Sequence, residues 1–269
     1  MSNVMNVNGK VILITGAGSG MGREMAIQLI QRGAKVAGLD IHLPQLLETQ
    51  QLCQVGDDQF LPLECNIADY EKVQTLPDLI IQHFGQIDGI MNNAGIIQPF
   101  VKVNDLSMEQ IKRVIDVNLY GCLNVTKVFL PHLLLRPEAH IVNTSSMGGF
   151  LPVPGQSIYG ATKAAVKLFT EALYAELKES NVRVTVVFPG AIATNITTNS
   201  GIDMPKSDQS SGMTSLAADK AATIILDAME QNKYRVLVGS DAKFLDILTR
   251  IAPEFATNFI RKKMKALLM

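Results

Sequence analysis

Short apolar runs alternate with helical stretches along this chain, and the alternation restricts the fold more than any other feature of the sequence. We expect strands at Lys10–Thr15, Ala34–Leu39, Phe60–Leu63, Ile87–Met91, Ala139–Thr144, Arg183–Phe188 and Arg235–Val238. Uninterrupted apolar strands that alternate with helices are typical of parallel sheets covered on both faces. Right-handed crossovers then wind the sheet in two directions from its centre. The pattern predicts an α/β protein with a doubly wound, mostly seven-stranded parallel sheet, helices on both faces and a Rossmann-like arrangement.

The whole chain, residues 1–269, is predicted to form a single domain. Its length is sufficient for one sizeable core, and it contains no internal repeat and no low-complexity linker. One segment, residues 195–215, is polar and has no regular pattern. A connection of this length is more often a substrate lid than an idle loop, with a solvated surface excursion as the alternative. Residues 240–269 are predicted to form a C-terminal helical extension.

Composition argues against several classes of function. A formal net charge of −1 gives no electrostatic case for nucleic acid. The cysteines Cys53, Cys65 and Cys122 lack CxxC spacing and are interpreted as reduced thiols, and the histidines lack metal-ligand spacing, so we expect no metal site. The N-terminal segment has no apolar signal region, and glycines and prolines interrupt the uncharged stretch Ile141–Thr162. We therefore expect a cytoplasmic protein.

A glycine-rich turn, Thr15–Gly22, directly follows the first apolar run and precedes the amphipathic stretch Met21–Arg32. Its pattern is T-G-x-x-x-G-x-G. Glycine lets the backbone approach a phosphate closely, and a helix N-terminus offers free N–H groups and the positive end of its dipole. The turn is therefore predicted to bind a phosphate group, and a turn shaped only for packing is the alternative.

An aspartate at the end of the second run predicts which dinucleotide binds. Asp40 follows Gly22 by 18 residues, and its carboxylate can accept hydrogen bonds from both ribose hydroxyls while repelling a 2′-phosphate. Positions 19 and 41 are Ser19 and Ile41, so no basic residue accompanies it. We predict NAD rather than NADP as the cofactor. The alternative role for Asp40 is that of an N-cap for a helix at His42–Leu52.

Tyr159 and Lys163 lie four residues apart, with Ser146 thirteen residues before the tyrosine. A spacing of four on a helix places both side chains on one face. A nearby ammonium favours phenolate and lowers the pKa of tyrosine from its usual value of about 10, and a serine hydroxyl can polarise a substrate oxygen. The group predicts proton transfer at an alcohol or carbonyl. A second pair, Tyr174 and Lys178, has no such serine, so we interpret Tyr174 as a packing residue.

Taken together, these motifs closely resemble the short-chain dehydrogenase/reductase family from about Val11 to Gly190, and more loosely to Val238. Asn92-Asn93-Ala94-Gly95 matches a family motif that lies along the cofactor. Asn66 departs from the pattern, because an aspartate often stands there and contacts the adenine. The resemblance implies catalytic roles for Asn118, Ser146, Tyr159 and Lys163. It implies cofactor contacts from Gly16, Ser19, Gly20, Met21, Gly22, Asp40, Ile41, Asn66, Ile67, Asn93, Ala94, Gly95, Tyr159, Lys163, Pro189, Gly190, Ile192 and Thr194.

The resemblance also implies the reaction, which is hydride transfer between nicotinamide and a carbinol or carbonyl carbon. Tyr159, as a phenolate, would take the hydroxyl proton of an alcohol, and Lys163 would lower the pKa of that tyrosine and bind the nicotinamide ribose. Ser146 would hold the substrate oxygen. Asn118 would steady a water that links Lys163 to solvent, or would satisfy local backbone at a helix kink.

The expected substrate wall is mostly apolar, with no arginine or lysine placed to bind a carboxylate or phosphate. Besides Ser146, the wall is predicted to contain Ile96, Ile97, Phe150, Leu151, Met204 and Met213. We therefore expect a small hydrophobic secondary alcohol or ketone as substrate. One alternative is an NADPH-type 3-ketoacyl or carbonyl reductase, and another is a protein that senses NAD(H) without turnover.

Partners are predicted mainly by analogy. The family often forms oligomers through its long central helices, here those that contain Asn118 and Tyr159, so we expect a homo-oligomer. The segment Glu254–Met269 is basic and amphipathic, although Lys263 falls within its apolar arc. Docking on a partner subunit or over the substrate cleft is favoured for it, and contact with a membrane surface is the less favoured alternative.

Overall fold

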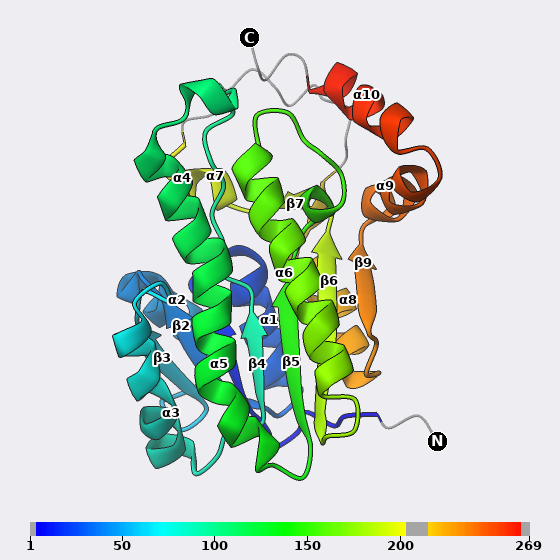
Figure 1. Cartoon of the computed structure of the whole chain (residues 1–269). Helices are drawn as coiled ribbons and strands as arrows, with labels where there is room; N and C mark the ends of the chain where they lie inside the picture. The colour runs from blue at the N-terminus through cyan, green and yellow to red at the C-terminus, as the bar shows by residue number, and fades with distance from the viewer. Residues whose placement is uncertain (1–3, 203–214, 265–269) are drawn as a thin grey trace.

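A computed structural model describes residues 4–202 and 215–264, and its centre is a seven-stranded parallel sheet (Figure 1). The strand order is β3-β2-β1-β4-β5-β6-β9. The strands are β1 (Val11–Thr15), β2 (Lys35–Asp40), β3 (Phe60–Glu64), β4 (Gly89–Asn92), β5 (Ala139–Thr144), β6 (Val182–Pro189) and β9 (Arg235–Val238). The predicted doubly wound α/β fold is confirmed, and the described residues form a single domain.

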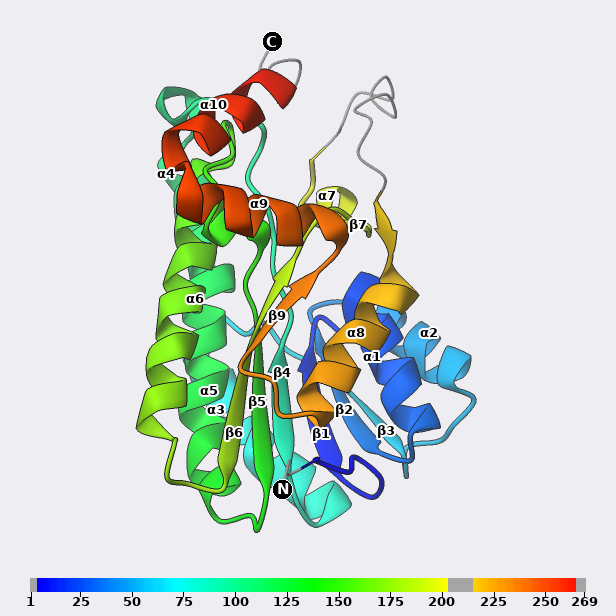
Figure 2. The same ribbon diagram turned by 90° about the vertical axis from the view of Figure 1, so that its right-hand side faces the viewer.

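Helices cover both faces of the sheet, which explains why β1 and β5 are buried at every position (Figure 2). On one face lie α1 (Gly20–Gln31), α2 (Leu43–Cys53) and α8 (Ala218–Glu230), and on the other lie α3 (Tyr70–Phe84), α4 (Met108–Ile115), α5 (Gly121–Leu134) and α6 (Ser157–Glu176). The side chains of β1 alternate between two hydrophobic cores. Ile12 and Ile14 belong to the first core, which includes residues of α1, α2 and α8, and Val11 and Leu13 belong to the second, which includes residues of α3, α5 and α6. Each such buried side chain contributes about 1.5–3 kcal/mol.

The sequence directly specifies several helix ends. Asp69 caps α3 by accepting a hydrogen bond from the Lys72 amide at 3.2 Å, and Gly85 ends that helix with a left-handed φ of 83°. Ser107 and Gln110 form a reciprocal capping box at the start of α4. Polar side chains therefore satisfy amide groups that would otherwise lack partners at these ends.

Short elements interrupt the regular alternation and had no periodicity from which to predict them. They are the 3₁₀ turns η1 (Val103–Asp105) and η3 (Met147–Gly149), the π-helix η2 (Asp116–Tyr120), the helix α7 (Ile196–Asn199), and the paired strands β7 (Ile192–Ala193) and β8 (Leu216–Ala217). Of the predicted lid, residues 195–202 and 215 are described.

The carboxyl ends of the strands meet along the upper edge of the sheet in Figure 1. The strand order reverses between β1 and β4, and such a switch point leaves a crevice where ligands bind in open α/β sheets. The C-terminal helices α9 (Ser240–Ile251) and α10 (Pro253–Lys263) lie at the same end, where Leu151 joins Leu245, Ala256 and Ile260 in a third core. Within the described ranges, no helix is long and apolar enough to cross a bilayer.

Candidate active site

The glycine turn after β1 leaves the first turn of α1 open to a ligand. Gly16 and Gly20 have φ values of 71° and 53°, the left-handed region that favours glycine. A Cβ on Gly22 would overlap the carbonyl oxygen of Gly16, so the turn and the helix are in direct backbone contact. No side chain in the described part of the chain caps α1, whose N-cap residue is Ser19. The free amides and the helix dipole suit an anion such as a pyrophosphate.

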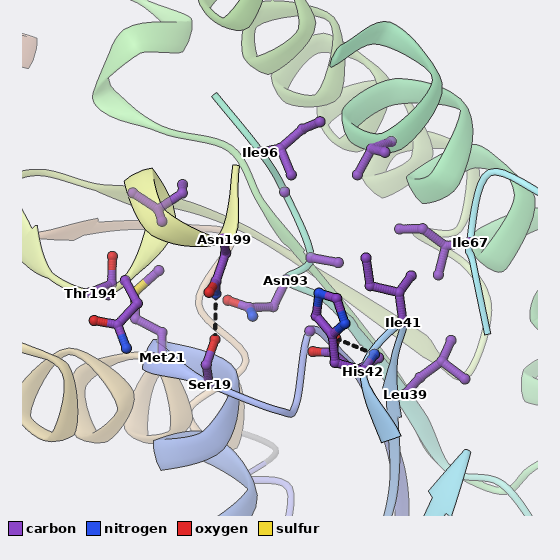
Figure 3. A pocket seen from close by; sticks show the side chains of 18 of the residues that line it. Ser19, Met21, Leu39, Ile41, His42, Ile67, Asn93, Ile96, Thr194 and Asn199 are labelled. Carbon is purple, nitrogen blue, oxygen red and sulfur yellow. Dashed lines mark hydrogen bonds between the residues drawn. The ribbon is translucent and has the colours of Figure 1, made fainter. Parts of the chain in front are cut away.

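A cavity of about 300 Å³ lies beside this turn at the switch point (Figure 3). It is lined by these predicted cofactor residues: Gly16, Ser19, Gly20, Met21, Asp40, Ile41, Asn66, Ile67, Asn93, Ala94, Gly95 and Thr194. Residues that were not predicted as cofactor contacts also line it: Leu39, His42, Cys65, Ile96, Arg113, Val117, Asn195, Ile196 and Asn199. The structure thus brings together segments that follow five different strands, β1, β2, β3, β4 and β7.

Six of the residues predicted to bind the cofactor lie outside the lining of this cavity: Gly22, Tyr159, Lys163, Pro189, Gly190 and Ile192. Gly22 is packed behind the glycine turn. Gly190 lies against Asp241 of α9, and a Cβ on Gly190 would overlap that carboxylate. Asp241 also accepts a hydrogen bond from the Ala191 amide at 2.7 Å. The loop after β6 is therefore held by Asp241 of α9.

Asp40 lines the cavity at the end of β2, where its carboxylate is held by backbone amides. One oxygen accepts a hydrogen bond from the Gly18 amide at 3.1 Å, and the other accepts one from the His42 amide at 3.2 Å. His42 is the N-cap residue of α2, so Asp40 is not. Arg23 donates to the Gly18 carbonyl and forms an ion pair with Glu48 at 2.6 Å. Because Arg23 is bonded to these groups and does not line the cavity, it does not neutralise the Asp40 carboxylate there.

The structure brings Ser146, Tyr159 and Lys163 together at the carboxyl end of β5. Ser146 directly follows the strand, and its Oγ accepts a hydrogen bond from the Gly148 amide at 3.0 Å while also bonding to the phenol of Tyr159. Tyr159 stands in the first turn of α6, and Lys163 one turn later. The Lys163 Nζ donates to the Thr144 carbonyl at 2.9 Å and lies 5.9 Å from the centre of the Tyr159 ring.

Burial shifts the pKa values of both ionisable groups towards their neutral forms. Desolvation raises the pKa of Tyr159 above its ordinary value, and the hydrogen bond with Ser146 offsets part of this rise. The direction is opposite to that expected from a neighbouring lysine alone. Desolvation also lowers the pKa of Lys163 from 10.5 to about 8, with Cys122 acting in the opposite direction. Near neutral pH the phenol therefore holds its proton, while the amine exchanges one readily.

The buried amine gives a stability prediction. The pKa of Lys163 is lower in the folded state, at about 8, than its ordinary value of 10.5. The folded protein therefore binds fewer protons than the unfolded chain between these values, so stability rises with pH across that window. Below this pH window, holding the buried amine in its charged form lowers the free energy of unfolding by about 3 kcal/mol. Lys163→Met should be more stable than the wild type by about 1–2 kcal/mol near pH 7, once the unpaired Thr144 carbonyl is counted.

Urea unfolding near pH 7 and again near pH 9.5 would measure this effect, with the gain shrinking towards zero at the higher pH. Lys178→Met is the control, because that amine is in an exposed hydrogen bond. A gain that is absent, or equal at both pH values, would contradict the prediction.

Asn118 lies in the π-helix η2 and holds the segment that follows β4. Its Oδ1 accepts a hydrogen bond from the Ile96 amide at 2.8 Å, and its Nδ2 donates to the Ile96 carbonyl at 2.9 Å and to Thr162 at 3.2 Å. A Cβ on Gly95 would lie 3.1 Å from the Lys163 Nζ and 3.3 Å from the Asn118 Oδ1, so these three residues meet at one point. π-Helical turns often occur at functional sites. The role of Asn118 in holding a water stays a prediction.

The predicted substrate wall is only partly described. Ile96 lines the cavity, and Ile97 is buried next to it. The ring of Phe150 packs 5.6 Å from that of Phe188, and Leu151 is fully buried beneath α9 and α10. The remaining two residues, Met204 and Met213, lie outside the described residues. The substrate assignment of all these residues stays a prediction.

The described part of the predicted lid is bonded to three sides of the cavity. Asn199 of α7 donates to the Ser19 hydroxyl at 2.8 Å, the bond drawn in Figure 3. The Ile97 amide donates to the Ser200 hydroxyl at 3.0 Å, and Arg113 reaches the Ser200 carbonyl at 3.4 Å. Sequence reasoning placed no role on Arg113 or Asn199, because single polar residues outside a motif give no local signal.

The second tyrosine–lysine pair lies at the far end of α6. The Lys178 Nζ donates to the Tyr174 hydroxyl at 2.8 Å, so the same spacing produces a direct hydrogen bond at an exposed position. The Tyr174 ring packs 4.4 Å from that of Tyr234 and contacts the second core. Its packing agrees with the interpretation from sequence.

Comparisons with known proteins agree with this geometry. A family model described as short chain dehydrogenase matches residues 10–205. A putative oxidoreductase, SadH, of Mycobacterium tuberculosis is 38% identical over 251 residues, which cover 90% of this chain and 91% of that protein. The structure of a short chain dehydrogenase/reductase from Burkholderia phymatum in complex with NAD matches with a TM-score of 0.84 and 26% identity, covering 93% of this chain and 96% of that chain. A 3-ketoacyl-(acyl-carrier-protein) reductase from Brucella melitensis complexed with NADH gives a TM-score of 0.79 and 28% identity, covering 88% and 98%.

Proposed function

Because the chain belongs to the short chain dehydrogenase/reductase family of oxidoreductases, we propose that it transfers hydride between a hydrophobic secondary alcohol or ketone and NAD. The observation that carries this proposal is the placement of two sites at one edge of the sheet. An uncapped helix N-terminus and the carboxylate of Asp40 stand at the cavity, and Ser146, Tyr159 and Lys163 are assembled at the end of β5.

The residues of the cavity fit NAD. The free amides of the first turn of α1 would hold the pyrophosphate, and Asp40 would accept hydrogen bonds from the ribose hydroxyls and repel a 2′-phosphate. Asn93 adds a buried Oδ1 that has no partner in the described structure. When bound, the nicotinamide supplies the hydride acceptor or donor. The relatives solved with NAD and with NADH support the same cofactor here.

The protein's own groups would manage the proton. Tyr159 would give its proton to a ketone oxygen or take one from an alcohol, while Ser146 would hold that oxygen beside the phenol. Burial keeps the phenol protonated near neutral pH, which suits the reduction of a ketone. Lys163, with a pKa of about 8, would exchange protons with its surroundings and restore the phenol between turnovers.

Titration of the purified protein with NADH and with NADPH, followed by nicotinamide fluorescence, tests the cofactor assignment. We expect tighter binding of NADH, and Asp40→Ala should weaken it by about 10- to 100-fold, the value of hydrogen bonds to a charged group. The same variant should bind NADPH more tightly than the wild type does, because the repulsion is removed. Asp58→Ala is the control for loss of an exposed carboxylate in a loop that does not line the cavity. An unchanged NADH/NADPH ratio in Asp40→Ala would refute the role of this residue.

A second candidate is an NADPH-type 3-ketoacyl or carbonyl reductase, and the similarity to the Brucella melitensis reductase supports the ketoacyl substrate of this candidate. The carboxylate of Asp40 argues against a 2′-phosphate. Turnover assays that pair NAD with secondary alcohols, and NADPH with a ketoacyl thioester, separate the two candidates. Turnover of the thioester alone would favour the second.

We also propose that the protein forms a homo-oligomer through the outer faces of its central helices. Tyr120 at the start of α5, Leu135 at its end and Leu168 on α6 are large apolar side chains exposed to solvent, with 83% of Leu135 and 66% of Leu168 accessible. Apolar side chains in such numbers on neighbouring helices support a subunit contact there.

A further inference from the structure

The buried amide of Gln98 joins the segment after β4 to the start of the catalytic helix. Only 1% of this residue is exposed, and a buried amide needs partners for both of its ends. Its Oε1 accepts hydrogen bonds from the Ile158 amide at 2.8 Å and from the Tyr159 amide at 3.0 Å. Its Nε2 donates to the Gly155 carbonyl at 3.0 Å. In return, the Gln98 carbonyl accepts a hydrogen bond from the Gln156 side chain at 2.8 Å.

Gln98 replaces the cap that α6 lacks. The first amides of a helix have no partner within it, and an N-cap side chain usually accepts a hydrogen bond from the second or third of them. The N-cap residue of α6, Gln156, makes no such bond. Gln98 accepts from the second and third amides instead, although it lies 60 residues earlier in the chain. It also bonds to Gly155, so it determines the shape of the turn that leads into the helix.

The catalytic helix is thereby held at two points by different strands. Further along α6, the Ser145 hydroxyl donates to the Lys163 carbonyl at 2.7 Å, and the Lys163 Nζ donates to the Thr144 carbonyl, so this part of the helix is bound to the end of β5. The Tyr159 backbone instead depends on Gln98, which follows β4. The separation between the Tyr159 phenol and Ser146 is therefore controlled jointly by the two strand ends.

The segment that carries Gln98 also contacts the cofactor cavity and the described part of the lid. Ile96 lines the cavity and is held by Asn118, and Ile97 bonds to Ser200. Resting on the proposed function, we propose that Gln98 is a positioning residue for proton transfer, acting through the backbone of Tyr159. Displacements of about 1 Å at such groups lower rates by as much as 100-fold.

Two substitutions at this position separate positioning from simple stability. Gln98→Leu is similar in size and leaves the Ile158 and Tyr159 amides without an acceptor. It should lower kcat by about 10- to 100-fold, with little change in the NADH dissociation constant. Gln98→Glu keeps acceptor oxygens at the helix N-terminus, where a negative charge is favourable, and should recover most of kcat. Thr170→Val is the control, because it removes a buried hydrogen bond to Asn143 from the same helix, away from Tyr159.

A second measurement does not depend on turnover. Ultraviolet difference titration, with Tyr159→Phe subtracted, reports the ionisation of the Tyr159 phenol. In Gln98→Leu the freed helix start should admit water and lower the pKa of Tyr159 towards its ordinary value, while Thr170→Val should leave it unchanged. Equal kcat losses in Gln98→Leu and Thr170→Val, or a Tyr159 titration that Gln98→Leu does not move, would overturn the inference. A wild type inactive with every alcohol and ketone would instead sink the proposed function, and the titration would still decide the role of Gln98.

Discussion

Tyr159→Phe is expected to lower turnover by about 10³-fold while the affinity for NADH stays within twofold of the wild type. The substitution removes only the hydroxyl that bonds to Ser146 and leaves the ring, so packing and the cofactor cavity are preserved. Without the phenol, the substrate oxygen has no group to exchange a proton with. Steady-state rates and NADH fluorescence titration on the same preparations give both quantities.

The chain contains its own control for this experiment. Tyr174→Phe removes a hydroxyl from the same helix, with the same spacing to a lysine and a hydrogen bond of 2.8 Å to it. That pair is exposed and lies far along α6 from the end of β5, so we expect turnover to stay within twofold of the wild type. If Tyr159→Phe kept more than a tenth of wild-type turnover, or if Tyr174→Phe lost as much, the assignment of the acid–base group would be wrong.

Gly22→Ala is expected to abolish detectable NADH binding and to destabilise the fold by about 3 kcal/mol, the upper range for overpacking. A methyl group there would overlap the Gly16 carbonyl oxygen and would come within 2.8 Å of the Asn93 Nδ2. Gly16 and Asn93 both line the cavity, so any shift of the backbone that makes room for the methyl group also changes the predicted phosphate site. Fluorescence titration and urea unfolding measure the two effects.

Gly85→Ala separates backbone strain from steric overlap. Gly85 has a φ of 83°, and a methyl group added to it would meet nothing within 4 Å, so alanine should cost only about 1 kcal/mol, through its left-handed conformation. Its NADH affinity should not change. Normal NADH binding by Gly22→Ala would show that the glycine turn has no part in the cofactor site.

The fold was predictable from sequence because its physical cause repeats along the chain. Strands covered on both faces are rich in apolar residues because they are buried at every position, as β1 and β5 are. The polar side chains of His140 and Asn143 in β5 are hydrogen-bonded inside the protein. The glycine turn was equally predictable, since the positive φ of Gly16 and Gly20 favours glycine. Such local requirements are visible before any tertiary structure is known.

The rest of the site depends on contacts between distant segments. Gln98 has no motif around it, and its function as a cap appears only when the end of β4 meets the start of α6. The direction of the Tyr159 pKa shift could not be predicted from sequence for the same reason. A spacing of four to Lys163 suggested a lowered value, whereas desolvation by the surrounding chain raises it. Burial is a property of the folded molecule, so the spacing alone could not give the sign.

The contact between Asp241 and the loop after β6 limits which substitutions this protein can accept during evolution. The carboxylate occupies the space where a side chain at position 190 would stand, and it also holds the Ala191 amide. A larger residue at 190 is therefore compatible only with a smaller or displaced one at 241. Substitutions at positions 190 and 241 are therefore expected to occur together. The residue at position 241 of α9 is limited by a glycine about fifty residues earlier in the chain.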